Sequence, residues 1–135
     1  GDLTKNFSRS EFVCKCGCGA LVLDPRLPEL LQQIRDYISR VKGRDCPLII
    51  TSGYRCPTHN ARVGGVPDSQ HVKGNAADIY SPQLSAKDLH DLILKAYKEH
   101  RLQHLGGLGQ YKTFVHVDVR ENADGRRGGG EDKPI

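Results

Sequence analysis

The sequence predicts an α+β domain in which a small antiparallel sheet carries helices packed on one side. Three observations predict it: a long helical pattern of apolar residues early in the chain, several short strand-like runs after it, and one helical pattern inserted among those runs. Helices followed by strands around a single inserted helix favour α+β over alternating α/β architecture. A chain of 135 residues has room for one such domain with one core.

A helix is predicted at residues 7–13. Ser8 is a favourable N-cap and Glu11 follows three residues later, which is the spacing of a capping box. Phe7 and Phe12 flank this pair and are placed to form a hydrophobic staple. The Cys- and Gly-rich stretch 14–20 interrupts the periodicity, so we expect a loop there.

The first long helix is predicted to begin at Asp24-Pro25, an N-cap residue followed by proline at the first helical position. Gly43 is placed to end it. Between these signals apolar residues recur at helical spacing, which predicts one buried stripe: Leu27, Leu30, Leu31, Ile34, Ile38 and Val41.

The second half of the chain predicts a sheet. Residues 47–51 and 76–80 are short apolar runs, and 106–111 and 113–119 form a closing pair of strands. Ser85 with Asp88 repeats the capping pattern and starts a helix that reaches about His100. Residues 53–75 are rich in glycine and proline, so we expect no regular structure in this long loop. Such a loop in a compact domain indicates function.

Composition excludes several classes of protein. The net charge is +4, with twenty basic residues interspersed among sixteen acidic ones, which favours a mixed solvated surface over a nucleic-acid-binding face. A weak attraction to an anionic polymer such as a cell wall remains open. No apolar run reaches 18 residues, so no transmembrane segment is expected.

Residues 1–121 are expected to form the domain, and residues 122–135 a flexible C-terminal tail. The protein is expected to be a monomer.

Five cysteines leave three interpretations open, and their odd number excludes complete internal pairing. Cys14, Cys16 and Cys18 lie in CKCGCG, whereas Cys46 and Cys56 stand apart. One or two structural disulfides, buried free thiols and a second metal site are all compatible with this pattern. A zinc ribbon would require two CxxC pairs, which the sequence lacks.

The residues that point to chemistry are His71 in the long loop, Asp78 on the strand after it, and His116 on the last strand. Imidazole and carboxylate are natural zinc ligands, and three protein ligands leave a position for a reactive water. Asp118, two residues after His116 on a strand, is expected on the same face. The remaining histidines have no comparable context and are expected on the surface: His59, His90, His100 and His104.

Three motifs carry a resemblance to a known family: SGYRCP, GGVPDSQHVKGNAADI and FVHVDVR. They resemble the signature of zinc D-alanyl-D-alanine carboxypeptidases and L-alanyl-D-glutamate endopeptidases, which share a Hedgehog-like DD-peptidase fold. FSRSEFVCKCGCG is similar to one branch of that family. The resemblance covers about residues 7–120 and implies one zinc ion per chain, held by His71, Asp78 and His116.

The resemblance also implies a substrate and a mechanism. It implies hydrolysis of peptidoglycan stem peptides, with an endolysin-like L-Ala–D-Glu endopeptidase preferred; a D-Ala-D-Ala carboxypeptidase and a non-catalytic zinc-containing cell-wall-binding module are the alternatives. The family's substrate-clamping arginine falls on Arg55, and Ser69 is expected either to bind substrate or to form a turn. Relatives that carry a catalytic carboxylate three residues before the second histidine have it where this chain has Thr113. Asp118 is therefore expected to be the general base, or else to hold a ligand histidine or bind the metal itself.

Such a substrate places the activity in the periplasm or cell wall. The first twenty residues are polar and contain no apolar core of a secretory signal. We therefore expect either that a signal has been removed or that export uses another route, such as holin-like release.

Overall fold

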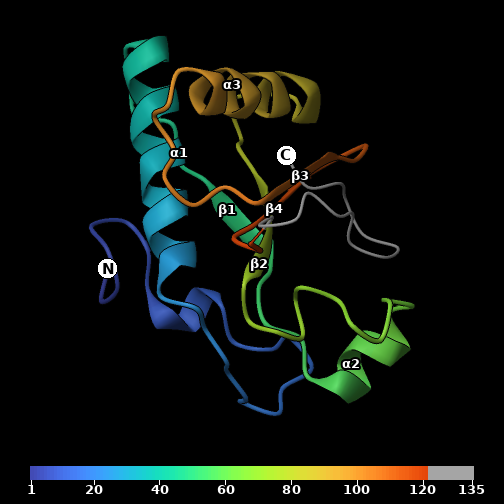
Figure 1. Ribbon diagram of the computed structural model, residues 1–135. Coiled ribbons are helices and arrows are strands. Elements are labelled where there is room, and N and C mark those ends of the chain that lie inside the picture. Colours follow the sequence, from blue (N-terminus) through green and yellow to red (C-terminus); the bar gives the residue numbers. More distant parts are fainter. Residues whose placement is uncertain (122–135) are drawn as a thin grey trace.

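A computed structural model of the chain describes residues 1–121 and contains, within them, one four-stranded sheet with the order β1-β2-β4-β3 (Figure 1). The strands are β1 (Ile49–Ser52), β2 (Ala76–Tyr80), β3 (Gly107–Gln110) and β4 (Val115–Asp118). Every neighbouring pair is antiparallel. The predicted α+β class with a small antiparallel sheet is therefore confirmed. The predicted tail, 122–135, lies outside the described residues.

Helix α1 (Arg26–Lys42) supplies one side of the core. The helix begins one residue later than predicted, with Pro25 as its N-cap and Arg26 as its first residue. The Asp24 carboxylate accepts the Arg26 backbone N–H at 3.0 Å from just before the cap. Gly43 ends it with φ of 68°, a left-handed conformation that glycine adopts without strain. The apolar stripe is buried except at its end, where Val41 is 45% exposed because it lies in the last turn, past the edge of the core.

Helix α3 (Ala86–Lys98) lies across α1 and next to the strands β3 and β4 (Figure 1). Its start is confirmed, because the Ser85 hydroxyl accepts the Asp88 backbone N–H at 3.0 Å. Leu89, Ile93 and Ala96 are its buried residues, and they join the hydrophobic core formed with α1 and the sheet. The core thus lies between the sheet and the helices α1 and α3.

The N-terminal helix is shorter than predicted. Only Arg9–Glu11 form a helix, a single 3-10 turn named η1. The Glu11 carboxylate accepts the Ser8 backbone N–H at 2.7 Å, as the capping box requires. Phe7 and Phe12 are both fully buried in the core. The Cys/Gly stretch that follows ends the turn, so the two aromatic side chains, and not a longer helix, attach this segment to the domain.

The absence of regular structure predicted for residues 53–75 is wrong at one place, helix α2 (Pro57–Arg62). Proline at its first position has the backbone angle that a helix start requires, and the Cys56 sulfur accepts the His59 backbone N–H at 3.4 Å. The buried Asn60 side chain donates to the Val66 carbonyl at 2.7 Å and closes the turn that follows. Figure 1 shows α2 at the opposite end of the molecule from α3.

Strand register places the polar residues of the sheet. On β4, His116 lies opposite Asp78 on β2 and Gly109 on β3. Asp118 lies opposite Ala76 and Gly107 in the same way. A Cβ atom at Gly107 would collide with the Asp118 carboxylate, so glycine leaves the space that this buried side chain occupies.

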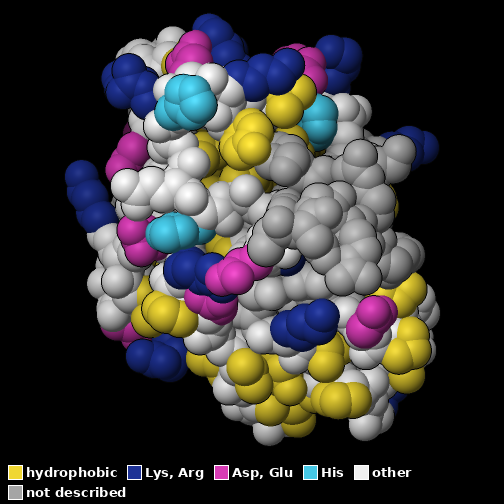
Figure 2. Space-filling model, in the orientation of Figure 1, with side chains coloured by type: hydrophobic (Ala, Val, Ile, Leu, Met, Phe, Trp, Pro, Cys, Tyr) yellow, Lys and Arg dark blue, Asp and Glu magenta, His cyan; other side chains and the backbone are white. Residues whose placement is uncertain are grey.

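The surface matches the mixed character predicted from composition. On the face shown in Figure 2, basic and acidic side chains are interspersed and do not gather into a basic patch. Within residues 1–121, no helix has the length and apolar character needed to cross a membrane.

Candidate metal centre

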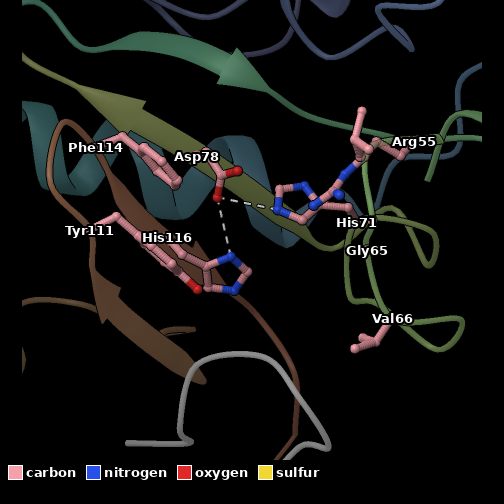
Figure 3. Close-up of a pocket in the computed structure, with 10 residues that line it drawn as sticks. Arg55, Gly65, Val66, His71, Asp78, Tyr111, Phe114 and His116 are labelled. Carbon is pink, nitrogen blue, oxygen red and sulfur yellow. Dashed lines mark hydrogen bonds and ion pairs between the residues drawn. The ribbon is translucent and has the colours of Figure 1, made fainter. Parts of the chain in front are cut away.

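Three side chains from separate parts of the chain meet beside the paired strands β2 and β4 (Figure 3). Asp78 is on β2, His116 is its direct partner on β4, and His71 comes from the loop that leads into β2. One ligand atom from each of the three lies within 4.8 Å of the others. His71 and His116 are almost fully buried, whereas Asp78 is partly accessible. The fold thus brings together the three residues that the sequence predicted as metal ligands.

Both histidines point a ring nitrogen at the same oxygen of Asp78. The distance to Asp78 Oδ1 is 3.2 Å from His71 Nε2 and 3.3 Å from His116 Nδ1. The dashed lines in Figure 3 mark these two contacts. The two rings stand edge to face, with centroids 5.3 Å apart. Different nitrogens of the two rings therefore converge on one point.

The other nitrogen of each ring is held by an oxygen atom. His71 Nδ1 lies 2.8 Å from the Gly53 carbonyl oxygen, and His116 Nε2 lies 2.8 Å from Asp118 Oδ2. Because these oxygens only accept, each of these nitrogens carries a proton. In the neutral rings, the nitrogens that face Asp78 then carry lone pairs, which repel the negative carboxylate. A cation bound by both nitrogens and the carboxylate removes this repulsion. The residues present therefore fit a zinc ion.

The electrostatics of the site without metal point the same way. Burial raises the pKa of Asp78, but the contacts with His116 and His71 outweigh it and lower the pKa to about 2. Burial lowers the pKa of His116, but Asp118 and Asp78 outweigh it and raise the pKa to about 9. In the metal-free site a proton on His116 thus takes the place of a cation.

Asp118 is fully buried behind His116. Its carboxylate accepts from the Arg120 guanidinium, with Oδ2 2.6 Å from Nη2, and from the backbone N–H of the same residue at 3.0 Å. Burial raises the pKa of Asp118, but His116 and Arg120 lower it below its usual value overall. The general-base role of Asp118 stays a prediction, and these contacts favour the alternative in which it holds a ligand histidine.

Ser69 supports the loop that carries His71. Its hydroxyl accepts the His71 backbone N–H at 3.1 Å, and the residue is fully buried. Ser69 does not line the cleft at the metal site. Its substrate-binding role also stays a prediction, and the geometry favours the turn-forming alternative.

Arg55 lines a cleft of about 320 Å³ that opens beside the three ligands. Its backbone N–H donates to the His71 carbonyl at 3.2 Å. Its buried Nε has no hydrogen-bond partner within residues 1–121. A Cβ atom at Gly65 would lie 2.8 Å from Arg55 Nη1, so glycine there leaves room for the guanidinium. The substrate-binding and catalytic roles of Arg55 stay predictions, and a guanidinium in the cleft is suited to an anionic group.

Two aromatic residues complete the opposite side of the cleft, and the sequence did not predict them as site residues. Tyr111 and Phe114 stack with ring centroids 4.6 Å apart and planes 8° from parallel. Both line the cleft. Phe114 is two residues before His116, so strand alternation indicated that Phe114 and His116 share a face. Tyr111 comes from the turn after β3, and no sequence pattern indicated its position.

Comparison with family models decides the family. The model described as peptidase M15 matches residues 5–118. The chain belongs to the peptidase M15 family. Residues His71, Asp78 and His116 lie inside the matched region, and the resemblance found in the sequence is confirmed. No curated protein sequence matches this M15 peptidase domain significantly.

Proposed function

We propose that this M15 domain is a zinc peptidase that cleaves the stem peptides of bacterial peptidoglycan, with an L-Ala–D-Glu bond as its target. One observation carries the proposal: His71 Nε2 and His116 Nδ1 converge on Asp78 Oδ1 while acceptors hold their other nitrogens. That arrangement fits a cation and lies in a cleft that Arg55 also lines. The substrate is found in the periplasm and cell wall, where the enzyme would act.

A bound zinc ion supplies two things to such a site, an activated water and polarisation of the scissile carbonyl. The protein supplies orientation and charge. Arg55 presents a planar fork of donors that binds a substrate carboxylate or the oxyanion developing in the transition state. The stacked pair Tyr111 and Phe114 gives an apolar wall for a substrate side chain.

Asp118 and Gly53 keep the two imidazoles in place. Each accepts the N–H on the far side of a ligand ring, which fixes the ring orientation and raises the basicity of the nitrogen that faces Asp78. Arg120 in turn holds the Asp118 carboxylate. We propose on these contacts that Asp118 positions His116 and does not exchange a proton with the substrate.

The shape of the cleft favours an endopeptidase. In Figure 3, Tyr111 and Phe114 lie on one side of the three ligands, and Arg55, Gly65 and Val66 lie on the other. Side chains on both sides of the metal site can bind substrate residues on both sides of the scissile bond. A carboxypeptidase needs only one extended side, with Arg55 holding the terminal carboxylate, and this is the second candidate.

The experiment is digestion of purified muropeptides by the zinc-loaded protein, with the new termini identified by mass spectrometry. We expect a product that begins with D-Glu. Release of D-Ala alone would support the carboxypeptidase. Binding to the muropeptides without any cleavage, in protein that contains zinc, would contradict the enzymatic proposal and support a binding module.

A further inference from the structure

We infer that the chain holds a second metal ion, a structural zinc bound by the thiolates of Cys14, Cys16, Cys18 and Cys56. The four sulfur atoms all lie within 4.8 Å of one another. They belong to two segments far apart in the sequence, the CKCGCG stretch and the SGYRCP loop. This cluster is separate from the His71, Asp78 and His116 set.

The sulfur spacing fits one tetrahedral ion. Zinc–sulfur bonds of about 2.3 Å place the sulfurs of a tetrahedral site about 3.8 Å apart. The Sγ atoms of Cys14 and Cys16 are 3.4 Å apart, and those of Cys16 and Cys56 are 3.8 Å apart. A disulfide requires about 2.05 Å. Four soft ligands in this arrangement select zinc, or iron as the next choice.

Backbone amides surround the cluster in the way that supports thiolates. Cys56 N–H donates to Cys14 Sγ at 3.4 Å, Ala20 N–H to Cys18 Sγ at 3.5 Å, and His59 N–H to Cys56 Sγ at 3.4 Å. Hydrogen bonds from N–H groups stabilise the ionised form of a ligand. Three of the four sulfurs thus already accept such a donor.

The local backbone explains how alternate cysteines converge. In an extended strand, residues two apart are separated by more than 6 Å. Here Gly17 and Gly19 have φ of 90° and 75°, and these left-handed turns fold the stretch on itself. Figure 1 shows this part of the chain at the lower end of the molecule, on the side of α2.

The proposed ion would fasten the N-terminal segment to the loop that forms the cleft. Tyr54 N–H donates to the Phe12 carbonyl at 2.9 Å, so the two segments already run side by side. Gly53, which holds His71, and Arg55, which lines the cleft, lie within three residues of Cys56. A metal bound at Cys56 would therefore fix the position of both.

The test is metal content of the full chain purified under reducing conditions with zinc. We expect about two zinc ions per chain in the wild type and about one in Cys18→Ser, a variant at an exposed position. The matched control is Cys46→Ser, which removes a thiol outside the cluster and should keep two. His71→Ala should also fall to one, so failure of the proposed catalytic site and failure of the cysteine site are distinguishable.

Cobalt binding gives a second readout that does not depend on the zinc stoichiometry. Co²⁺ added to metal-free wild type should produce an intense thiolate-to-cobalt charge-transfer band, retained in His71→Ala and lost in Cys18→Ser. Alkylation without reduction, carried out in denaturant so that the buried Cys14 and Cys46 are accessible, should label all five cysteines of the metal-free protein. The inference is overturned if cobalt gives no such band, if Cys18→Ser binds as much zinc as wild type, or if the four cluster thiols prove to be paired as disulfides.

Discussion

His71 and His116 turn different ring nitrogens, Nε2 and Nδ1, toward one oxygen of Asp78, at 3.2 and 3.3 Å. The difference follows from where the rings originate. His116 is on a central strand, and its Nε2 is hydrogen-bonded to Asp118. His71 is in a loop, and its Nδ1 is hydrogen-bonded to the Gly53 carbonyl. A strand residue and a loop residue therefore direct their remaining ring nitrogens to the same point beside Asp78.

Replacing His71 or His116 by alanine should remove one equivalent of zinc and abolish peptide cleavage. The loss of one of three protein ligands disrupts a tetrahedral catalytic site. His104→Ala is the control, because His104 is partly exposed and pairs with Glu29 at 3.7 Å, away from the cleft. Metal analysis of the three variants decides the matter, and unchanged zinc in both ligand variants would show the site assignment to be wrong.

Asp118→Asn separates the positioning role from the base role. As a positioning residue, Asp118 should change zinc affinity by about 10–100-fold when replaced. The melting temperature should also fall, because the buried Arg120 loses the ion pair with Asp118. Asp91→Asn, at an exposed pair with Lys87, should leave both unchanged.

The base role predicts a different outcome for the same variant. Turnover would then fall by about 10²–10⁴ while zinc affinity stays at the wild-type value. Measuring zinc affinity and kcat on the same preparation of Asp118→Asn distinguishes the two roles.

Arg55→Lys should lower kcat/KM although the charge is retained. Arginine holds a carboxylate or oxyanion through two parallel hydrogen bonds, and lysine is a point charge. Zinc content and melting temperature should match the wild type. Arg35→Lys is the control, since Arg35 pairs with Asp45 away from the cleft. If Arg55→Lys cleaves at the wild-type rate, the substrate clamp lies elsewhere.

The stability of the metal-free protein should depend on pH through His116. Asp118 and Asp78 overcome the effect of burial and raise the pKa of His116 from 6.5 to about 9. A raised pKa in the folded state gives stability that is complete below pH 6.5 and is lost as the pH rises through about 9. The melting temperature of chelator-treated protein should therefore fall over this interval.

His116→Asn is the control for that pH dependence, because it keeps a polar side chain but has no titrating ring. Its melting temperature should fall less than that of the wild type between pH 6.5 and about 9. Equal slopes for the two proteins would mean that other groups, and not His116, carry the dependence.

Much of the fold could be predicted because local signals and tertiary structure agree. Strand β2 coincides with the apolar run 76–80. Gly43 ends α1 in the left-handed conformation that its position indicated. Helix α2 was missed because only six residues form it, within a stretch whose glycines and prolines predict loop. Val41 kept the helical period but lies beyond the last element that could cover it.

The site could be predicted in part for a similar reason. The three ligands were found from residue types and the family resemblance, and strand pairing brings Asp78 and His116 together. Neither source showed that Asp118 is enclosed by Arg120, because that depends on the space left by Gly107 on another strand. The convergence of Cys56 with CKCGCG also depends on long-range packing, so the absence of CxxC pairs pointed away from it.

The most direct measurement of the central claim is anomalous diffraction at the zinc absorption edge from crystals of the zinc-loaded protein. The account predicts an anomalous peak between His71 Nε2, His116 Nδ1 and the Asp78 carboxylate, with His116 Nε2 still bonded to Asp118. No peak at that position, in crystals whose zinc content has been verified, would contradict it.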